Sequence, residues 1–131
     1  MPEAELAGVS ELRRLRRERL VAWVTNSVGC LYCAWMGATL LLGTRGFLEM
    51  FKSVGAELPP STAFVVSNRI WLYPVVFGTA VLALLVKELL IGDKRLSTML
   101  TFSIVLVVHW VAYWFVSLHY VPLFALIQNW S

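Results

Sequence analysis

The chain has 131 residues, of which 59% are hydrophobic and only 15% are charged, and its mean hydropathy is +0.73. A typical water-soluble domain is nearer half apolar and a quarter charged. Residues 96–131 contain no Asp, Glu, Lys or Arg. This composition argues against a water-soluble globule, a disordered tail, a small secreted disulfide-rich protein and a nucleic-acid-binding domain. The length suits one domain. Among the broad classes of protein, the composition favours an integral membrane protein.

The N-terminal segment, residues 1–19, is basic. Its five arginines are Arg13, Arg14, Arg16, Arg17 and Arg19. Apolar residues recur at every third position from Leu6 to Leu15, which predicts an amphipathic helix. We expect this helix to lie along the inner leaflet, where anionic lipid head groups attract each basic residue by about 1 kcal/mol. The alternative is a docking helix for a cytoplasmic partner.

Three apolar runs are long enough to cross a bilayer. A hydrocarbon core of about 30 Å needs about 20 apolar residues in a helix. The runs predict transmembrane helices at about residues 20–43, 63–89 and 97–120. Within the middle span, Arg69 and Lys87 flank an uncharged apolar stretch at residues 70–86, and we expect them to extend their charges to opposite interfaces. Backbone groups in lipid must bond within their own segment, so we predict an all-α membrane protein with three transmembrane helices.

The distribution of cations predicts the orientation of the chain, because Lys and Arg near the ends of the spans stay in the cytoplasm. The arginine cluster precedes the first span, and Lys87, Lys94 and Arg95 lie between the second and third spans. Three crossings place these two segments on the same side. We therefore predict a cytoplasmic N-terminus and an outer C-terminus, with residues 121–131 forming an outer interfacial tail.

The outer connection, residues 44–62, is predicted to be ordered. Apolar residues line one face of residues 45–54, which indicates a short interfacial helix. Gly55 is placed to end that helix in a left-handed conformation. The two prolines that follow favour an extended corner, and Ser61 or Thr62 is expected to cap the next helix.

Residues 47–62, with the sequence FLEMFKSVGAELPPST, resemble a known connection. It joins the first two membrane helices in the type II secretion F / pilus-assembly platform family, where a helix with spaced Phe residues leads to a Gly-Ala-Glu-Leu-Pro-x-x-Thr stretch. The resemblance extends over residues 45–70 or so. The family also has large helical cytoplasmic domains, for which this chain has only short segments, so the motor-binding activity is not carried over. The resemblance implies a bacterial inner membrane, a similar hairpin and a role within an assembly.

Small residues form a stripe on the first predicted span. Its members, which occupy an arc of roughly 100°, are Asn26, Gly29, Cys33 and Gly37. Such stripes let two helices approach closely in lipid, and Asn26 can hydrogen-bond across the contact. We predict a helix-packing face. The alternative is redox or metal binding by Cys30 and Cys33, although a four-ligand site would need both histidines as well.

His109 is the titratable residue deepest within a predicted span, so it is the candidate cofactor-binding residue. One interpretation is a haem or quinone ligand, or a residue on a proton path. The other is a neutral imidazole bonded to Asn26, Thr25 or a backbone carbonyl. His119 lies about 80° round the same helix near the outer interface, so the two histidines cannot bind one ion or one haem together.

The sequence contains no phosphate-binding loop, nucleophile elbow or His-Glu-x-x-His motif, and its polar residues are too few to assemble a catalytic group. We predict a non-catalytic packing, scaffold or accessory subunit of a membrane complex, or a homo-oligomer, without a cofactor or metal. The alternatives are a redox subunit that binds a cofactor through His109 and a small oligomeric transporter or channel.

Overall fold

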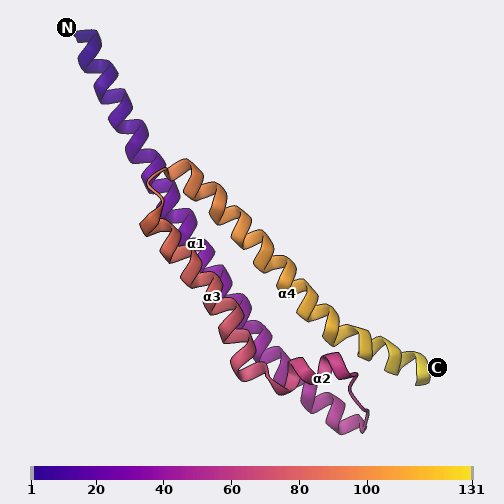
Figure 1. Cartoon of the computed structure of the whole chain (residues 1–131). Coiled ribbons are helices and arrows are strands. Elements are labelled where there is room, and N and C mark those ends of the chain that lie inside the picture. The colour runs from indigo at the N-terminus through magenta and orange to yellow at the C-terminus, as the bar shows by residue number, and fades with distance from the viewer. Residues whose placement is uncertain (1, 131) are drawn as a thin grey trace.

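The computed structural model describes residues 2–130, and within this range 93% of the chain is helical. The helices are α1 (Pro2–Val54), α2 (Pro60–Ser67), α3 (Arg69–Leu90) and α4 (Lys94–Trp130). Figure 1 shows α3 and α4 packed along α1, with the two termini at opposite ends. The three long helices are each long and apolar enough to cross a membrane, as the sequence predicts.

The structure has two ends that differ in chemistry. The end that carries the N-terminal arginines and the connection at residues 91–93 is here called the arginine end. The opposite end carries α2 and the connection at residues 55–59, and is called the proline end. Since α1 and α4 both run from the arginine end to the proline end, they are parallel, whereas α3 returns between these ends.

Helix α1 is continuous over 53 residues, whereas the sequence predicts separate helices before, within and after the first span. Proline occurs only at its first position, and Gly43 and Gly46 cost only about 1 kcal/mol each in a helix, so no residue forces a break. At 1.5 Å per residue, α1 is about 80 Å long, far more than a bilayer core. The basic segment continues along the axis of α1, and its N-terminal part extends beyond the start of α4 (Figure 1).

The C-terminus of α1 confirms the predicted left-handed glycine. Gly55 has a φ of 67°. Its N–H donates to the Lys52 carbonyl at 3.3 Å, and the Ala56 N–H donates to the Phe51 carbonyl at 3.4 Å. This pair of hydrogen bonds is a Schellman motif, which satisfies carbonyls that the end of the helix would otherwise leave without donors.

The predicted cap of the next helix is wrong. Helix α2 begins at Pro60, and no side chain caps it. Proline at the first helical position has no N–H to satisfy and has a φ already suited to a helix, so neither Ser61 nor Thr62 is needed as a cap. The Thr62 hydroxyl instead donates to the Leu118 carbonyl of α4 at 2.9 Å, which attaches α2 to α4.

The second predicted span is divided at Asn68, between α2 and α3. The Asn68 amide nitrogen donates to the Phe64 carbonyl at 2.9 Å, and its oxygen accepts from the Trp71 indole at 2.9 Å. The Arg69 guanidinium donates to the Val66 carbonyl at 2.9 Å. These side chains satisfy the end of α2, so Arg69, predicted as an interfacial charge, is also part of the helix junction.

The core lies where the three long helices meet. Its buried residues are Cys33, Leu40, Val65, Tyr73, Phe77, Leu84, Val108, Ala112 and Phe115. Many large apolar side chains point outward instead, among them Trp23, Leu89 and Trp110, which are 67%, 86% and 73% exposed. Apolar residues on this scale are normally buried in a water-soluble monomer, so the outer surface suits lipid.

Candidate functional site

The predicted packing face of α1 lies against α3 and α4 of the same chain. A Cβ atom on Gly29 would lie 3.2 Å from the Thr101 side chain of α4, and one on Gly37 would lie 3.0 Å from the Phe77 side chain of α3. Asn26 and Cys33 are buried on the same stripe. The two glycines therefore allow close approach within the chain, and this face is not open to a second protein.

The cysteines and the asparagine of this region differ in burial and in their contacts. Cys30 and Cys33 are free thiols, and Cys33 is fully buried in the core. Within residues 2–130, no group of three His, Cys, Asp or Glu side chains could hold a metal ion. The Asn26 side-chain oxygen is buried without a hydrogen-bond partner, so the expected bond across the contact is not formed by this atom.

His109 contacts Tyr32, which is not among the partners predicted from the sequence. Its Nδ1 contacts the hydroxyl of Tyr32 on α1, rather than Asn26, Thr25 or a backbone carbonyl. The His109 ring lies on the exposed side of α4. The contact joins α1 to α4 outside the core.

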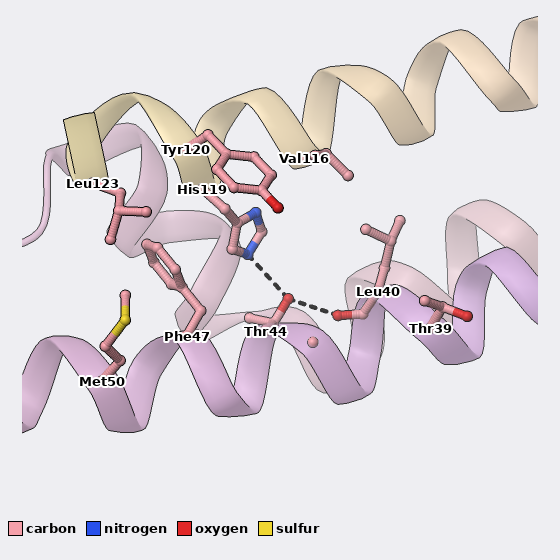
Figure 2. A pocket seen from close by; sticks show the side chains of 10 residues that line it. Thr39, Leu40, Thr44, Phe47, Met50, Val116, His119, Tyr120 and Leu123 are labelled. Atoms are coloured by element: carbon pink, nitrogen blue, oxygen red, sulfur yellow. Dashed lines mark hydrogen bonds between the residues drawn. The ribbon is translucent and has the colours of Figure 1, made fainter.

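A buried polar cluster at the proline end brings together Thr44 of α1, Tyr73 of α3 and His119 of α4. The Thr44 hydroxyl lies 2.9 Å from the Tyr73 hydroxyl and 3.0 Å from His119 Nε2. It also donates to the Leu40 carbonyl of its own helix at 2.7 Å. We call these three side chains the Thr44 cluster; Figure 2 shows the bonds from Thr44 to His119 and to Leu40.

The hydrogen bonds of the Thr44 cluster set the roles of its atoms. His119 Nδ1 lies 2.6 Å from the Phe115 carbonyl, which can only accept, so Nδ1 carries a hydrogen. In a neutral imidazole Nε2 then accepts, and the Thr44 hydroxyl shares its single hydrogen between Nε2 and the Leu40 carbonyl. The Tyr73 hydroxyl donates to Thr44. Every polar atom of the cluster therefore has a partner within the chain.

A cavity of about 360 Å³ adjoins the Thr44 cluster between α1 and α4. It is lined by Thr39, Leu40, Gly43, Thr44, Phe47, Met50, Val116, His119, Tyr120 and Leu123. The ring of Phe47 meets His119 edge to face, with centroids 4.9 Å apart, and Tyr120 lies beside the imidazole (Figure 2). The lining holds one imidazole and three hydroxyls, without a carboxylate, thiol or amine, so it suits packing or binding better than nucleophilic catalysis.

The sequence could have revealed Thr44. Continuing the packing face of α1 from Gly37 in steps of three or four residues reaches positions 40, 44, 47 and 51. Leu40, Thr44 and Phe51 are indeed buried. The first predicted span ends at residue 43 and the next predicted helix begins at 45, so the predicted face stops at this boundary. The predicted site histidine is the deeper His109, whereas His119 is the histidine in the Thr44 cluster.

A second polar cluster closes the turn between α3 and α4 at the arginine end. Ser97 donates to the Glu88 carboxylate at 2.6 Å, and Lys87 donates to the Ser97 hydroxyl at 2.9 Å. Lys87 and Lys94 contact the same carboxylate at 3.2 and 3.0 Å. Lys87 is only 8% exposed, so the charge that was expected to reach the interface freely is held by Glu88 and Ser97.

The N-terminal arginines lie on the exposed part of α1. Arg14 pairs with Glu18 at 3.1 Å. The other four arginines of the cluster have no side-chain partner among residues 2–130; these are Arg13, Arg16, Arg17 and Arg19. Exposed ion pairs contribute little to stability, so the fold does not depend on these charges.

No protein-family model, curated protein or solved structure matches this chain. The resemblance of residues 45–70 to the platform family therefore stays a prediction, based on its sequence motif alone.

Proposed function

We propose that this chain is a small multi-pass protein of the bacterial inner membrane that acts as a non-catalytic packing, scaffold or accessory subunit. It works either as a homo-oligomer or within a larger membrane complex. Its N-terminus lies in the cytoplasm and its C-terminus in the periplasm. The observation that carries the proposal is an open apolar groove between α3 and α4.

This groove is a hollow of about 370 Å³ with an almost wholly apolar lining. The residues that line it are Val76, Phe77, Thr79, Ala80, Ala83, Ser103, Ile104, Val107, Val108 and Val111. Helix α1 does not fill it. Small residues at such a surface let helices approach closely in lipid. A ridge of side chains from another helix therefore fits between α3 and α4.

The orientation is supported by the charges of the arginine end. Arg14 and Arg17 line one hollow with Lys94 and Arg95, and Lys87 and Lys94 contact the same carboxylate, so these cations lie at the same end of the molecule. Cytoplasmic segments are enriched in Lys and Arg. The proline end has charges of both signs, as in the pair of Arg45 with Glu49. The two termini lie at opposite ends of the molecule (Figure 1).

A packing role is also supported by the internal pairing of the polar sites. The Thr44 cluster and the cluster around Glu88 satisfy their own hydrogen bonds. The Thr44 hydroxyl lies 3.0 Å from His119 Nε2, but it also contacts the Leu40 carbonyl and the Tyr73 hydroxyl, so its hydrogen-bonding capacity is used within the chain. The contacts of the two clusters join helices, so they stabilise the scaffold that presents the groove.

The groove is tested by filling it. Ala83→Phe and Ser103→Phe each place an aromatic ring in the hollow, and we expect both variants to lose the oligomer or the co-purifying partner, because overpacking blocks the incoming helix. The measurements are the mass of the protein complex in mild detergent and mass spectrometry of the proteins purified with it.

Leu82→Phe and Leu106→Phe are the matched controls. These leucines are 61% and 72% exposed and do not line the groove, so their variants should keep the wild-type mass and partners. If the groove variants also keep both, the groove is not the packing surface and the proposal fails.

A further inference from the structure

A hollow of about 460 Å³ lies between α1 and α4 at the arginine end. It is lined by Arg14, Arg17, Glu18 and Val21 of α1 and by Lys94, Arg95, Thr98, Met99 and Phe102 of α4. Four of these side chains are cationic and one is a carboxylate. The hollow therefore carries an excess of positive charge, contributed by two helices that are distant in the sequence.

Two of the four cations are already paired. Arg14 contacts Glu18 at 3.1 Å, and Lys94 contacts Glu88 at 3.0 Å. The side chains of Arg17 and Arg95 have no partner among residues 2–130. A guanidinium presents a planar fork of donors that matches phosphate oxygens in pairs. Two unpaired guanidinium groups on facing helices thus suit a single phosphate.

The deeper part of the same hollow is apolar. Val21, Met99 and Phe102 line it, and they are 45%, 57% and 66% exposed. Because α1 and α4 run in parallel, both change from charged to apolar in the same direction. Val21 lies one turn, about 6 Å, beyond Arg17, and Phe102 lies about 10 Å beyond Arg95. A soluble anion would use only the charged part.

We infer that this hollow binds one anionic glycerophospholipid. Arg17 and Arg95 hold the phosphate, and an acyl chain lies along Val21, Met99 and Phe102. The inference goes beyond the packing role, and it depends on the membrane location but not on the groove between α3 and α4. It also differs from the general attraction of a basic segment to an anionic leaflet, which any of the five arginines would contribute equally.

The test compares two double variants of the full chain that lose the same charge. Arg17→Gln with Arg95→Gln removes the phosphate ligands, whereas Arg13→Gln with Arg16→Gln removes two arginines that do not line the hollow. Each protein is placed in nanodiscs of mixed phosphatidylglycerol and phosphatidylcholine, and the retained lipids are counted by native mass spectrometry. We expect the first variant to retain on the order of tenfold less phosphatidylglycerol than the second.

Two further arms separate a lipid from a soluble anion. Phe102→Ser should weaken phosphatidylglycerol retention, whereas Phe124→Ser, a 63% exposed phenylalanine of the same helix outside the hollow, should not. Excess inorganic phosphate should leave the bound lipid in place. Equal loss in both double variants would mean diffuse attraction only, and displacement by phosphate would mean a soluble-anion site; either result overturns the inference. If the Gln pair misfolds, Arg17→Lys with Arg95→Lys keeps the charge, removes the forks and should still retain less lipid than the wild type.

Discussion

Thr44 shows how one hydroxyl joins three helices. It contacts Tyr73 of α3 and His119 of α4 while it remains bonded to the Leu40 carbonyl of its own helix. Side-chain hydrogen bonds between helices in membranes contribute about 0.6 kcal/mol on average and up to about 1.7 kcal/mol. Losing the shared partner also leaves the buried Tyr73 hydroxyl and His119 Nε2 without a bond, which costs more than the bond itself.

We therefore expect Thr44→Val, a change of nearly constant volume, to destabilise the protein by about 1–3 kcal/mol. The measurement is thermal unfolding in detergent. Thr39→Val is the control, because the Thr39 hydroxyl bonds only to the Trp35 carbonyl of its own helix, at 2.8 Å. Equal melting temperatures for the two variants would show that the Thr44 cluster contributes no stability.

Among the elements, α1 contributes most to the packing, because both α3 and α4 lie along it. The three apolar runs of the sequence predict the three long helices, because apolar runs of this length are typical of helices that cross a membrane. The continuity of α1 and the break at Asn68 were not predicted. The first follows from the lack of any residue that forces a break in α1, and the second from local side-chain bonds at the helix junction, and hydropathy encodes neither.

The close approach of α1 to α3 at Gly37 predicts that a larger side chain there destabilises the protein. Gly37→Leu forces a side chain against Phe77, where a Cβ alone would lie 3.0 Å away, so we expect a loss of about 1–3 kcal/mol from overpacking. Gly46→Leu is the control. Nothing lies within 4 Å of its Cβ position, so this variant should melt at or above the wild-type temperature, as leucine favours a helix.

This experiment also separates internal packing from packing between proteins. Because Gly37 faces α3 of its own chain, Gly37→Leu should lower the melting temperature of the folded protein at every concentration. A variant that melts normally but loses its oligomer would show that this face contacts another copy, contrary to the structure.

For the whole molecule, the proposed topology predicts that its two connections face opposite compartments, because one crossing, by α3, lies between them. Glu57→Cys lies in the connection at the proline end and Asp93→Cys in the one at the arginine end, and both positions are exposed. A membrane-impermeant maleimide added to intact spheroplasts should label the first and reach the second only after lysis. The unsubstituted protein, with only Cys30 and Cys33, gives the background. Equal labelling before lysis would contradict the proposed orientation.

The candidate site was less predictable than the fold. Asn26, Gly29, Cys33 and Gly37 share one face of α1, and helix geometry alone is enough to place them there. The partners of that face were not predictable, since three helices can pair in several ways. Depth along the apolar run, which makes His109 the candidate, does not measure burial: His119 lies nearer the end of the span, yet Phe47 and Thr44 of another helix enclose it.

The unbroken course of α1 has a mechanical consequence. A straight helix without a hinge behaves as a stiff rod, so torque applied to its arginine-bearing tip is transmitted along its length. Rotation about the long axis would displace Gly29 from Thr101 and Thr44 from His119 in the same motion. A rotation of α1 imposed at the arginine end would thereby change helix contacts at the proline end, some tens of ångströms away, through this one helix.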